Sequence, residues 1–164
     1  ERKIIVFGCH RIGSLFLKYF AKRKKEVLVV DFNPEIIRSL IAKKVPCVYG
    51  DFANDEVLEK ANLLNAEIVV STIPDLDDNI SLIKKIKEIN PKMTVFVTGE
   101  KIDDAMELYD KGADYVLLPK VITGELGFNL AKRVLDDKTS IKVIKREQIK
   151  HLKKIHGLLY HKEE

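Results

Sequence analysis

The residues best suited to chemistry in this chain form a glycine turn near the N-terminus. The apolar run 4–7 leads into it, and a helical pattern follows it directly. A strand that ends in such a turn and opens a helix directs backbone N–H groups and the positive end of the helix dipole at one place, which binds phosphate. An acid about 20 residues further on, here Asp31, is the usual ribose ligand. The turn consists of Gly8, Cys9, His10, Arg11, Ile12 and Gly13.

His10 departs from the dinucleotide-binding pattern G-x-G-x-x-G, because it stands where a middle glycine lets the backbone approach the pyrophosphate. Histidine tolerates positive φ better than most residues, so the turn itself survives. Three interpretations remain open: the imidazole donates to a ligand bound higher in the crevice, the site prefers a mononucleotide, or the site is weakened. The strand, the helix and Asp31 together favour nucleotide binding.

The elements that must position this turn alternate along the chain. Apolar runs separated by helical patterns predict a doubly wound, Rossmann-like α/β fold, with a parallel sheet of strand order 3-2-1-4-5-6. Helix-start signals support it: Pro34 follows Asn33, Asn54 precedes the helical pattern 57–64, and Asp77 to Asn79 precede the pattern 80–89. The predicted strands are 3–8, 26–31, 46–49, 67–72, 93–98 and 114–118.

Length and composition are typical of one compact domain followed by a tail. The chain has 164 residues, 46% of them hydrophobic, and its net charge of +4 gives little support for nucleic-acid binding. No apolar run approaches the length of a membrane span. We expect a nucleotide-binding domain at 1–137 and a basic helical tail or linker at 138–164, which holds eight Lys or Arg against three acids. Because the chain starts at Glu1 without a methionine, we expect it to be part of a longer protein.

The tail carries an apolar stripe flanked by lysines. Ile149, Leu152, Ile155 and Leu159 fall on one face of a helix. Three partners are considered for this face: the chain's own domain, a second protomer or neighbouring domain, and, last, a membrane surface.

The two cysteines do not predict a disulfide. Cys9 follows the first strand and Cys47 begins the third, and in the expected order one strand separates them. Two strand spacings give about 9.6 Å, which exceeds the reach of a disulfide. Reduced thiols are typical of a cytosolic compartment.

Two further loops lie at the carboxyl ends of strands, where open α/β sheets bind ligands. After the third strand, Asp51 either accepts from an adenine amino group, with Phe52 lining the pocket, or caps the next helix. After the fourth strand, Thr72 and the backbone at Ile73 are candidates to touch ribose or phosphate. Phe32, directly after Asp31, completes the set of candidate binding residues.

An acidic segment that follows the fourth strand superficially resembles a calcium loop. It lacks the glycine and the glutamate that such a loop needs, so we interpret its carboxylates as helix caps and predict no metal site. The segment contains Asp75, Asp77, Asp78 and Asn79.

The residues described so far resemble the RCK family, also called KTN or TrkA-N domains, from residue 3 to about 135. The Gly50-Asp51 element and the run Gly112-Ala-Asp-Tyr-Val-Leu-Leu-Pro119 distinguish this resemblance from ordinary dehydrogenases. Domains of this family regulate potassium channels, Trk and Ktr uptake systems and Kef-type cation/proton antiporters. The resemblance implies that NAD(H), AMP, ADP or ATP binds as an effector and undergoes no reaction.

The resemblance also implies roles for particular residues and partners. Gly8, Arg11, Ile12 and Gly13 match the phosphate turn, and Arg11 is expected to contact the phosphates. Asp31 matches the ribose acid, Asp51 the adenine-side acid, and Thr72 with Ile73 the edge of the fourth strand. A homodimer through late helices at about 123–136, a membrane-embedded cation transporter or channel as partner, and a cytoplasmic location are implied as well.

Three departures from the family pattern concern the site: His10 in the glycine turn, Ala53 where threonine or serine often follows the Gly-Asp element, and no identifiable arginine after the fifth strand. The usual β-rich C-terminal subdomain does not follow in this chain. Two alternatives remain beside the regulatory function. An NAD-dependent oxidoreductase would need a substrate domain with a general acid or base, and an interaction module would have a decayed nucleotide site.

Overall fold

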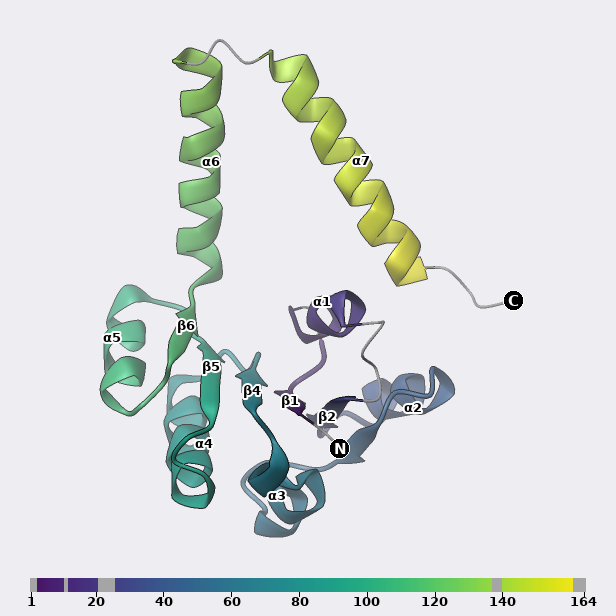
Figure 1. Ribbon diagram of the computed structural model, residues 1–164, viewed down its shortest axis with the longest axis vertical. Helices are drawn as coiled ribbons and strands as arrows, with labels where there is room; N and C mark the ends of the chain where they lie inside the picture. The colour runs from purple at the N-terminus through teal and green to yellow at the C-terminus, as the bar shows by residue number, and fades with distance from the viewer. Residues whose placement is uncertain (1–2, 11, 21–25, 137–139, 161–164) are drawn as a thin grey trace. The chain divides into compact units, whose positions relative to one another are not determined.

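The computed structural model describes residues 3–10, 12–20, 26–136 and 140–160, with side chains up to 154. Six parallel strands form one sheet in the order β3-β2-β1-β4-β5-β6 (Figure 1). This order confirms the predicted doubly wound topology, in which the chain reverses direction across the sheet between β1 and β4. The strands are β1 (Ile4–Phe7), β2 (Val27–Asp31), β3 (Cys47–Tyr49), β4 (Ile68–Ser71), β5 (Thr94–Thr98) and β6 (Tyr115–Leu117).

Helices alternate with the strands, and three of them begin at a residue whose side chain caps the helix. Asn33 and Asn54 cap α2 and α3 as predicted, each by accepting the backbone N–H two residues later. The cap of α4 is Asp75, and the predicted caps Asp77 and Asp78 lie inside the first turn instead. The helices of the sheet are α1 (Ile12–Tyr19), α2 (Pro34–Ala42), α3 (Asp55–Ala61), the short turn η2 (Leu63–Asn65), α4 (Leu76–Ile89) and α5 (Ile102–Asp110).

The core has two layers, one on each face of the sheet. Ile5 and Phe7 of β1 belong to the cluster that packs on α3, α4 and α5, whereas Ile4 and Val6 belong to the cluster that packs on α1 and α2. Successive strand residues point to opposite faces, so a central strand buried on both sides must be apolar throughout. All four residues of β1 are buried, which fixes the position of the turn that follows it.

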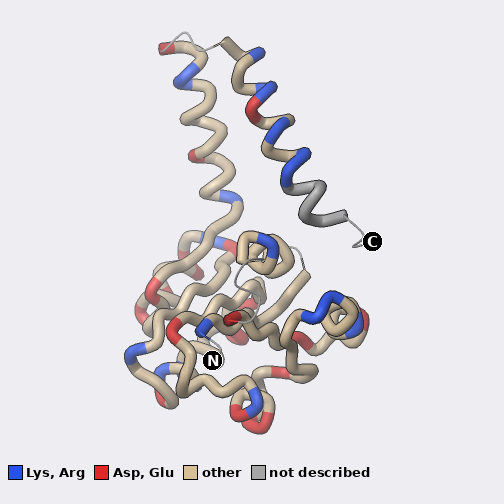
Figure 2. Tube along the Cα trace, turned by 45° about the vertical axis from the view of Figure 1, so that its right-hand side comes forward, with Lys and Arg blue, Asp and Glu red and all other residues tan. Residues whose placement is uncertain are grey.

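The chain divides into two units, residues 1–119 and 120–164. The second unit consists almost entirely of α6 (Pro119–Leu135) and α7 (Ile141–Tyr160). No residue of α6 is buried, and Lys and Arg residues occur along the described part of α7 (Figure 2). The predicted boundary near 137 falls between these helices, and residues 137–139 lie outside the described residues. Among the described helices, none is both long enough and apolar enough to cross a membrane.

Candidate nucleotide-binding site

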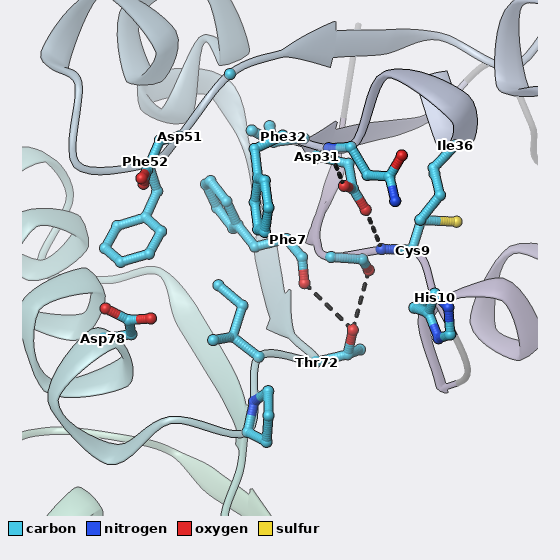
Figure 3. A pocket seen from close by; sticks show the side chains of 16 residues that line it. Phe7, Cys9, His10, Asp31, Phe32, Ile36, Asp51, Phe52, Thr72 and Asp78 are labelled. Carbon is cyan, nitrogen blue, oxygen red and sulfur yellow. Dashed lines mark hydrogen bonds between the residues drawn. The ribbon is translucent and has the colours of Figure 1, made fainter. Parts of the chain in front are cut away.

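The glycine turn after β1 is held by a side chain from the loop that follows β4. Gly8 has φ +80°, in the region that favours glycine, and a Cβ there would lie 2.9 Å from Thr72 Oγ1. The Thr72 hydroxyl donates to the carbonyl oxygen of Gly8 at 3.0 Å (Figure 3). Thr72 therefore acts first by fixing the turn, and its oxygen keeps acceptor capacity for a ligand.

Gly13 serves packing. A Cβ on Gly13 would lie 2.1 Å from the carbonyl oxygen of Gly8, so only glycine lets α1 start this close to the end of β1. Close helix–strand packing is the role of the third glycine in the dinucleotide-binding turn. Gly13 and Ile12 do not line the cavity described below, so their contact with a phosphate stays a prediction.

Asp31 ends β2 and is buried, with 7% of its surface exposed. Its Oδ2 accepts the backbone N–H of Cys9, and its Oδ1 accepts the backbone N–H of Asn33, both at 2.8 Å. The carboxylate thus joins the glycine turn after β1 to the loop after β2. Each carboxylate oxygen has more than one lone pair, so Asp31 can still accept from a ribose hydroxyl.

Asp51 does not cap α3, which removes the alternative role considered for it. Its Oδ1 accepts the backbone N–H of Ala53 at 2.9 Å, while Asn54 caps the helix. Gly50 is required just before it, because a Cβ there would lie 2.4 Å from Val57 Cγ2. Phe52 is buried next to Phe7, with ring centroids 6.4 Å apart. The loop after β3 is therefore anchored by an aromatic side chain and leaves the Asp51 carboxylate exposed.

The predicted binding residues meet around one cavity of about 310 Å³ at the carboxyl ends of β1, β2, β3 and β4. This is the position at which doubly wound sheets bind ligands. A larger hollow of about 600 Å³ lies between α3 and α4 but contains none of the predicted residues. The predicted residues that line the first cavity are Gly8, Cys9, His10, Asp31, Phe32, Asp51, Phe52, Thr72 and Ile73. Arg11 lies outside the described residues.

Asp78 is a lining residue that the sequence interpretation missed. It was assigned to helix capping, but Asp75 is the cap, and its Oδ1 accepts the backbone N–H of Asp78 at 3.0 Å. Asp78 instead faces the cavity near Asp51 (Figure 3). Desolvation, and then the negative charges of Asp75, Asp51 and Asp77, raise the pKa of Asp78 above its usual value. In the sequence, only the position of Asp78 in the first turn of α4 could have indicated that this side chain faces the cavity.

Cys9 also lines the cavity, as an unreactive thiol. Burial, followed by the charge of Asp31, raises its pKa to about 11, so the thiolate is scarce at neutral pH. Both cysteines are free thiols, as predicted from their separation by one strand. In the described part of the chain, no group of three or more His, Cys, Asp or Glu residues has the arrangement to hold a metal ion.

Asn79 fixes the loop after β4, which forms one wall of the cavity. It is fully buried, and its Nδ2 lies within hydrogen-bonding distance of three carbonyl oxygens, those of Ile73, Asp75 and Thr98, at 2.8 to 3.0 Å. The Thr98 hydroxyl in turn donates to the Ser71 carbonyl oxygen at 3.0 Å. These bonds tie the loop after β4 to the end of β5.

The parallel sheet and the cavity at its carboxyl edge define a Rossmann-like α/β domain. Within that class, the model of the TrkA-N domain family matches residues 4–119, and the chain belongs to this family. The RCK resemblance seen in the sequence is therefore confirmed.

The curated proteins that are similar to this chain are longer than it. Potassium channel protein 1 of Methanocaldococcus jannaschii is 24% identical over 73% of this chain, and the potassium-efflux protein KefC of Escherichia coli is 24% identical over 70%. An uncharacterised protein of Methanothermus fervidus is 26% identical over 98% of the chain. The chain spans 37%, 18% and 27% of these relatives, respectively.

Solved structures support the same fold. The TrkA-N domain of the Escherichia coli inner membrane protein ybaL is 20% identical with a TM-score of 0.75, covering 79% of this chain and 96% of that domain. The Kef C-terminal domain of Shewanella denitrificans, in its AMP-bound form, is 18% identical with a TM-score of 0.67, covering 96% and 94%. The NAD(P)-binding domain of an exopolyphosphatase-related protein from Archaeoglobus fulgidus is 20% identical with a TM-score of 0.71, covering 81% and 99%. Other similar structures are of GsuK bound to ADP and to NAD.

Proposed function

We propose that this chain is a regulatory domain that binds NAD(H) or an adenine nucleotide and thereby controls a potassium or other cation channel or transporter at the cytosolic face of a membrane. The observation that carries the proposal is the cavity at the carboxyl ends of β1 and β4, where the order of the strands reverses. This cavity is lined by Gly8, Asp31, Asp51 and Thr72. The turn after β1 supplies the phosphate end, and Asp31 and Asp51 supply acceptors for ribose and base. The relatives named above support the assignment to ion transport.

The ligand acts as an effector in this proposal, without reaction. The histidines outside the cavity, His151, His156 and His161, all belong to the tail. A hydride-transfer enzyme would need a general acid or base beside the nicotinamide, and the regulatory function needs none. It needs a difference in affinity between two arrangements of the protein.

Nucleotide binding is tested by thermal shift and calorimetry with AMP, ADP, ATP, NAD, NADH and adenosine. A ligand at 100 times its dissociation constant is expected to stabilise the chain by about 2.7 kcal/mol. Arg11→Ala is expected to weaken ATP and NAD much more than adenosine, because the guanidinium compensates phosphate charge. Absence of binding by all six compounds would refute the proposed function and favour the decayed module. Equal weakening of ATP and adenosine would mean that Arg11 acts through the fold.

We also propose that the chain forms a two-fold homodimer through α6, with α7 as a second candidate contact. Apolar side chains on α6 are exposed or half-buried, among them Ile122, Leu126, Leu130 and Val134. Exposed apolar stripes of this kind mark interfaces, and two-fold dimers are the commonest closed assembly.

Light scattering at low and high protein concentration tests the dimer. We expect a concentration-dependent dimer that Leu130→Asp disrupts, because the substitution would bury an unpaired charge in the interface. Asn129→Asp adds the same charge at an exposed neighbouring position and is expected to leave the dimer intact. A wild-type chain that stays monomeric at every concentration would contradict the interface.

A second parent protein for the same sensor is favoured by one specific observation. The Archaeoglobus fulgidus domain belongs to an exopolyphosphatase-related protein. In this alternative the nucleotide controls a hydrolase that cleaves the phosphoanhydride bonds of polyphosphate. Assays of nucleotide-dependent cation flux and of polyphosphate hydrolysis, on the longest native protein that contains this chain, separate the two.

A further inference from the structure

We infer that the cavity selects its ligand by charge: Asp51 and Asp78 form an acidic wall that favours adenine ligands with little phosphate charge, a nucleoside monophosphate or a dinucleotide, over a nucleoside triphosphate. The inference rests on the proposed nucleotide-binding function and names the class of nucleotide that the site takes.

The first step is the charge of the cavity. Three carboxylates line it, those of Asp31, Asp51 and Asp78, and none of the lining residues that the structure describes is a lysine or arginine. Asp31 faces two backbone N–H groups that compensate its charge. Asp51 has one such partner, on Oδ1, and the ion pairs found among the described residues include neither Asp51 nor Asp78.

The second step is the position of the two residues. Asp51 and Asp78 come from different elements, the loop after β3 and the first turn of α4, yet they lie on the same side of the cavity, with the glycine turn on the other side (Figure 3). The charge of Asp51 contributes to the raised pKa of Asp78, so the two carboxylates interact across the wall. Lys85, whose ammonium lies close to the loop after β3, is bonded to Asp55 Oδ1 at 2.7 Å and to the Ala53 carbonyl oxygen at 2.8 Å.

The third step is the ligand. ATP carries more negative charge than AMP, and AMP carries more than NAD. ATP and AMP present the same adenosine to the loop after β3 and differ only in their phosphates, so this pair compares the effect of charge directly. NAD carries a second nucleoside on its diphosphate. Like charges repel, and the repulsion grows with the charge that the phosphates carry, so the triphosphate is the least favoured ligand.

The test measures the dissociation constants of ATP, AMP and NAD by calorimetry in the presence of EDTA, so that no metal ion masks phosphate charge. The wild-type chain is expected to bind AMP and NAD more tightly than ATP. Asp51→Asn and Asp78→Asn should each shift the ATP-to-AMP ratio of affinities toward ATP by about threefold or more. Asparagine keeps the side-chain oxygen that accepts from Ala53, so the local turn is preserved.

Asp77→Asn is the matched control, because Asp77 lies in the same helical turn, carries the same charge and does not line the cavity. It should leave the ratio unchanged, and high salt should shrink the wild-type preference. An ATP affinity equal to or above that of AMP, unchanged ratios in both cavity variants, or an equal change with Asp77→Asn would overturn the inference while leaving nucleotide binding in place. Failure of all nucleotides to bind would instead overturn the proposed function, and the inference with it.

Discussion

Gly13→Ala is expected to lower the free energy of unfolding by about 3 kcal/mol or more, which is the cost of forcing a side chain into a packed backbone contact. The new Cβ would lie 2.1 Å from the carbonyl oxygen of Gly8, and a backbone atom cannot rotate away as a flexible side chain does. Either α1 moves off the sheet or the turn after β1 deforms. Urea unfolding followed by circular dichroism measures the loss.

Gly124→Ala is the matched control for this substitution. Gly124 lies in α6, and a Cβ there would meet no atom within 4 Å. Alanine has the higher helix propensity, so this variant is expected to keep or slightly raise stability. If Gly13→Ala unfolds at the same urea concentration as the wild type, the close approach of α1 to β1 is wrong.

Asp31→Ala is expected to have two separable effects. The free energy of unfolding should fall by about 2 kcal/mol or more, because the buried N–H group of Cys9 and the part-buried N–H group of Asn33 lose a charged acceptor. Adenosine ligands should bind more weakly by roughly one to two kcal/mol, the cost of a lost hydrogen bond to a charged group. The preference for NAD over NADP should also disappear, since a carboxylate at this position repels a 2′-phosphate.

Urea unfolding measures the first effect, and calorimetry at a temperature where the variant remains folded measures the second. Asp77→Ala removes an exposed carboxylate outside the cavity and should change neither quantity. Equal or tighter binding of NADP by the wild-type chain would contradict the assignment of Asp31 to the ribose.

The sheet could be predicted from the sequence because its central strands are buried on both faces and therefore read as uninterrupted apolar runs. The site could be located for a related reason. Asp31 ends a strand, and Gly8, Asp51 and Thr72 lie in the loops that follow strands. Parallel strands bring their carboxyl ends to one edge. Periodicity thus specified which loops converge, although these residues are far apart in the chain.

The roles of individual side chains were harder to predict, because they depend on which partner each group finds in the folded chain. Asp75 and Asp78 are equivalent as capping residues in the sequence, but only Asp75 accepts the helix N–H, and Asp78 is left to face the cavity. The sequence predicts that Asp31 accepts a hydrogen bond from a ribose hydroxyl. In the structure its carboxylate already accepts hydrogen bonds from two backbone N–H groups. Gly13 likewise matches a phosphate-binding motif while acting through helix packing.

The bonds made by Asn79 bear on how a ligand could send a signal. Because one buried amide ties the loop after β4 to the end of β5, that wall of the cavity is preorganised, and a ligand loses little affinity to ordering it. Because this wall is already ordered, the binding of a nucleotide changes its conformational entropy little. A response to binding is therefore transmitted either by a rigid-body displacement of this wall or by a conformational change in the elements on the β1 and β2 side.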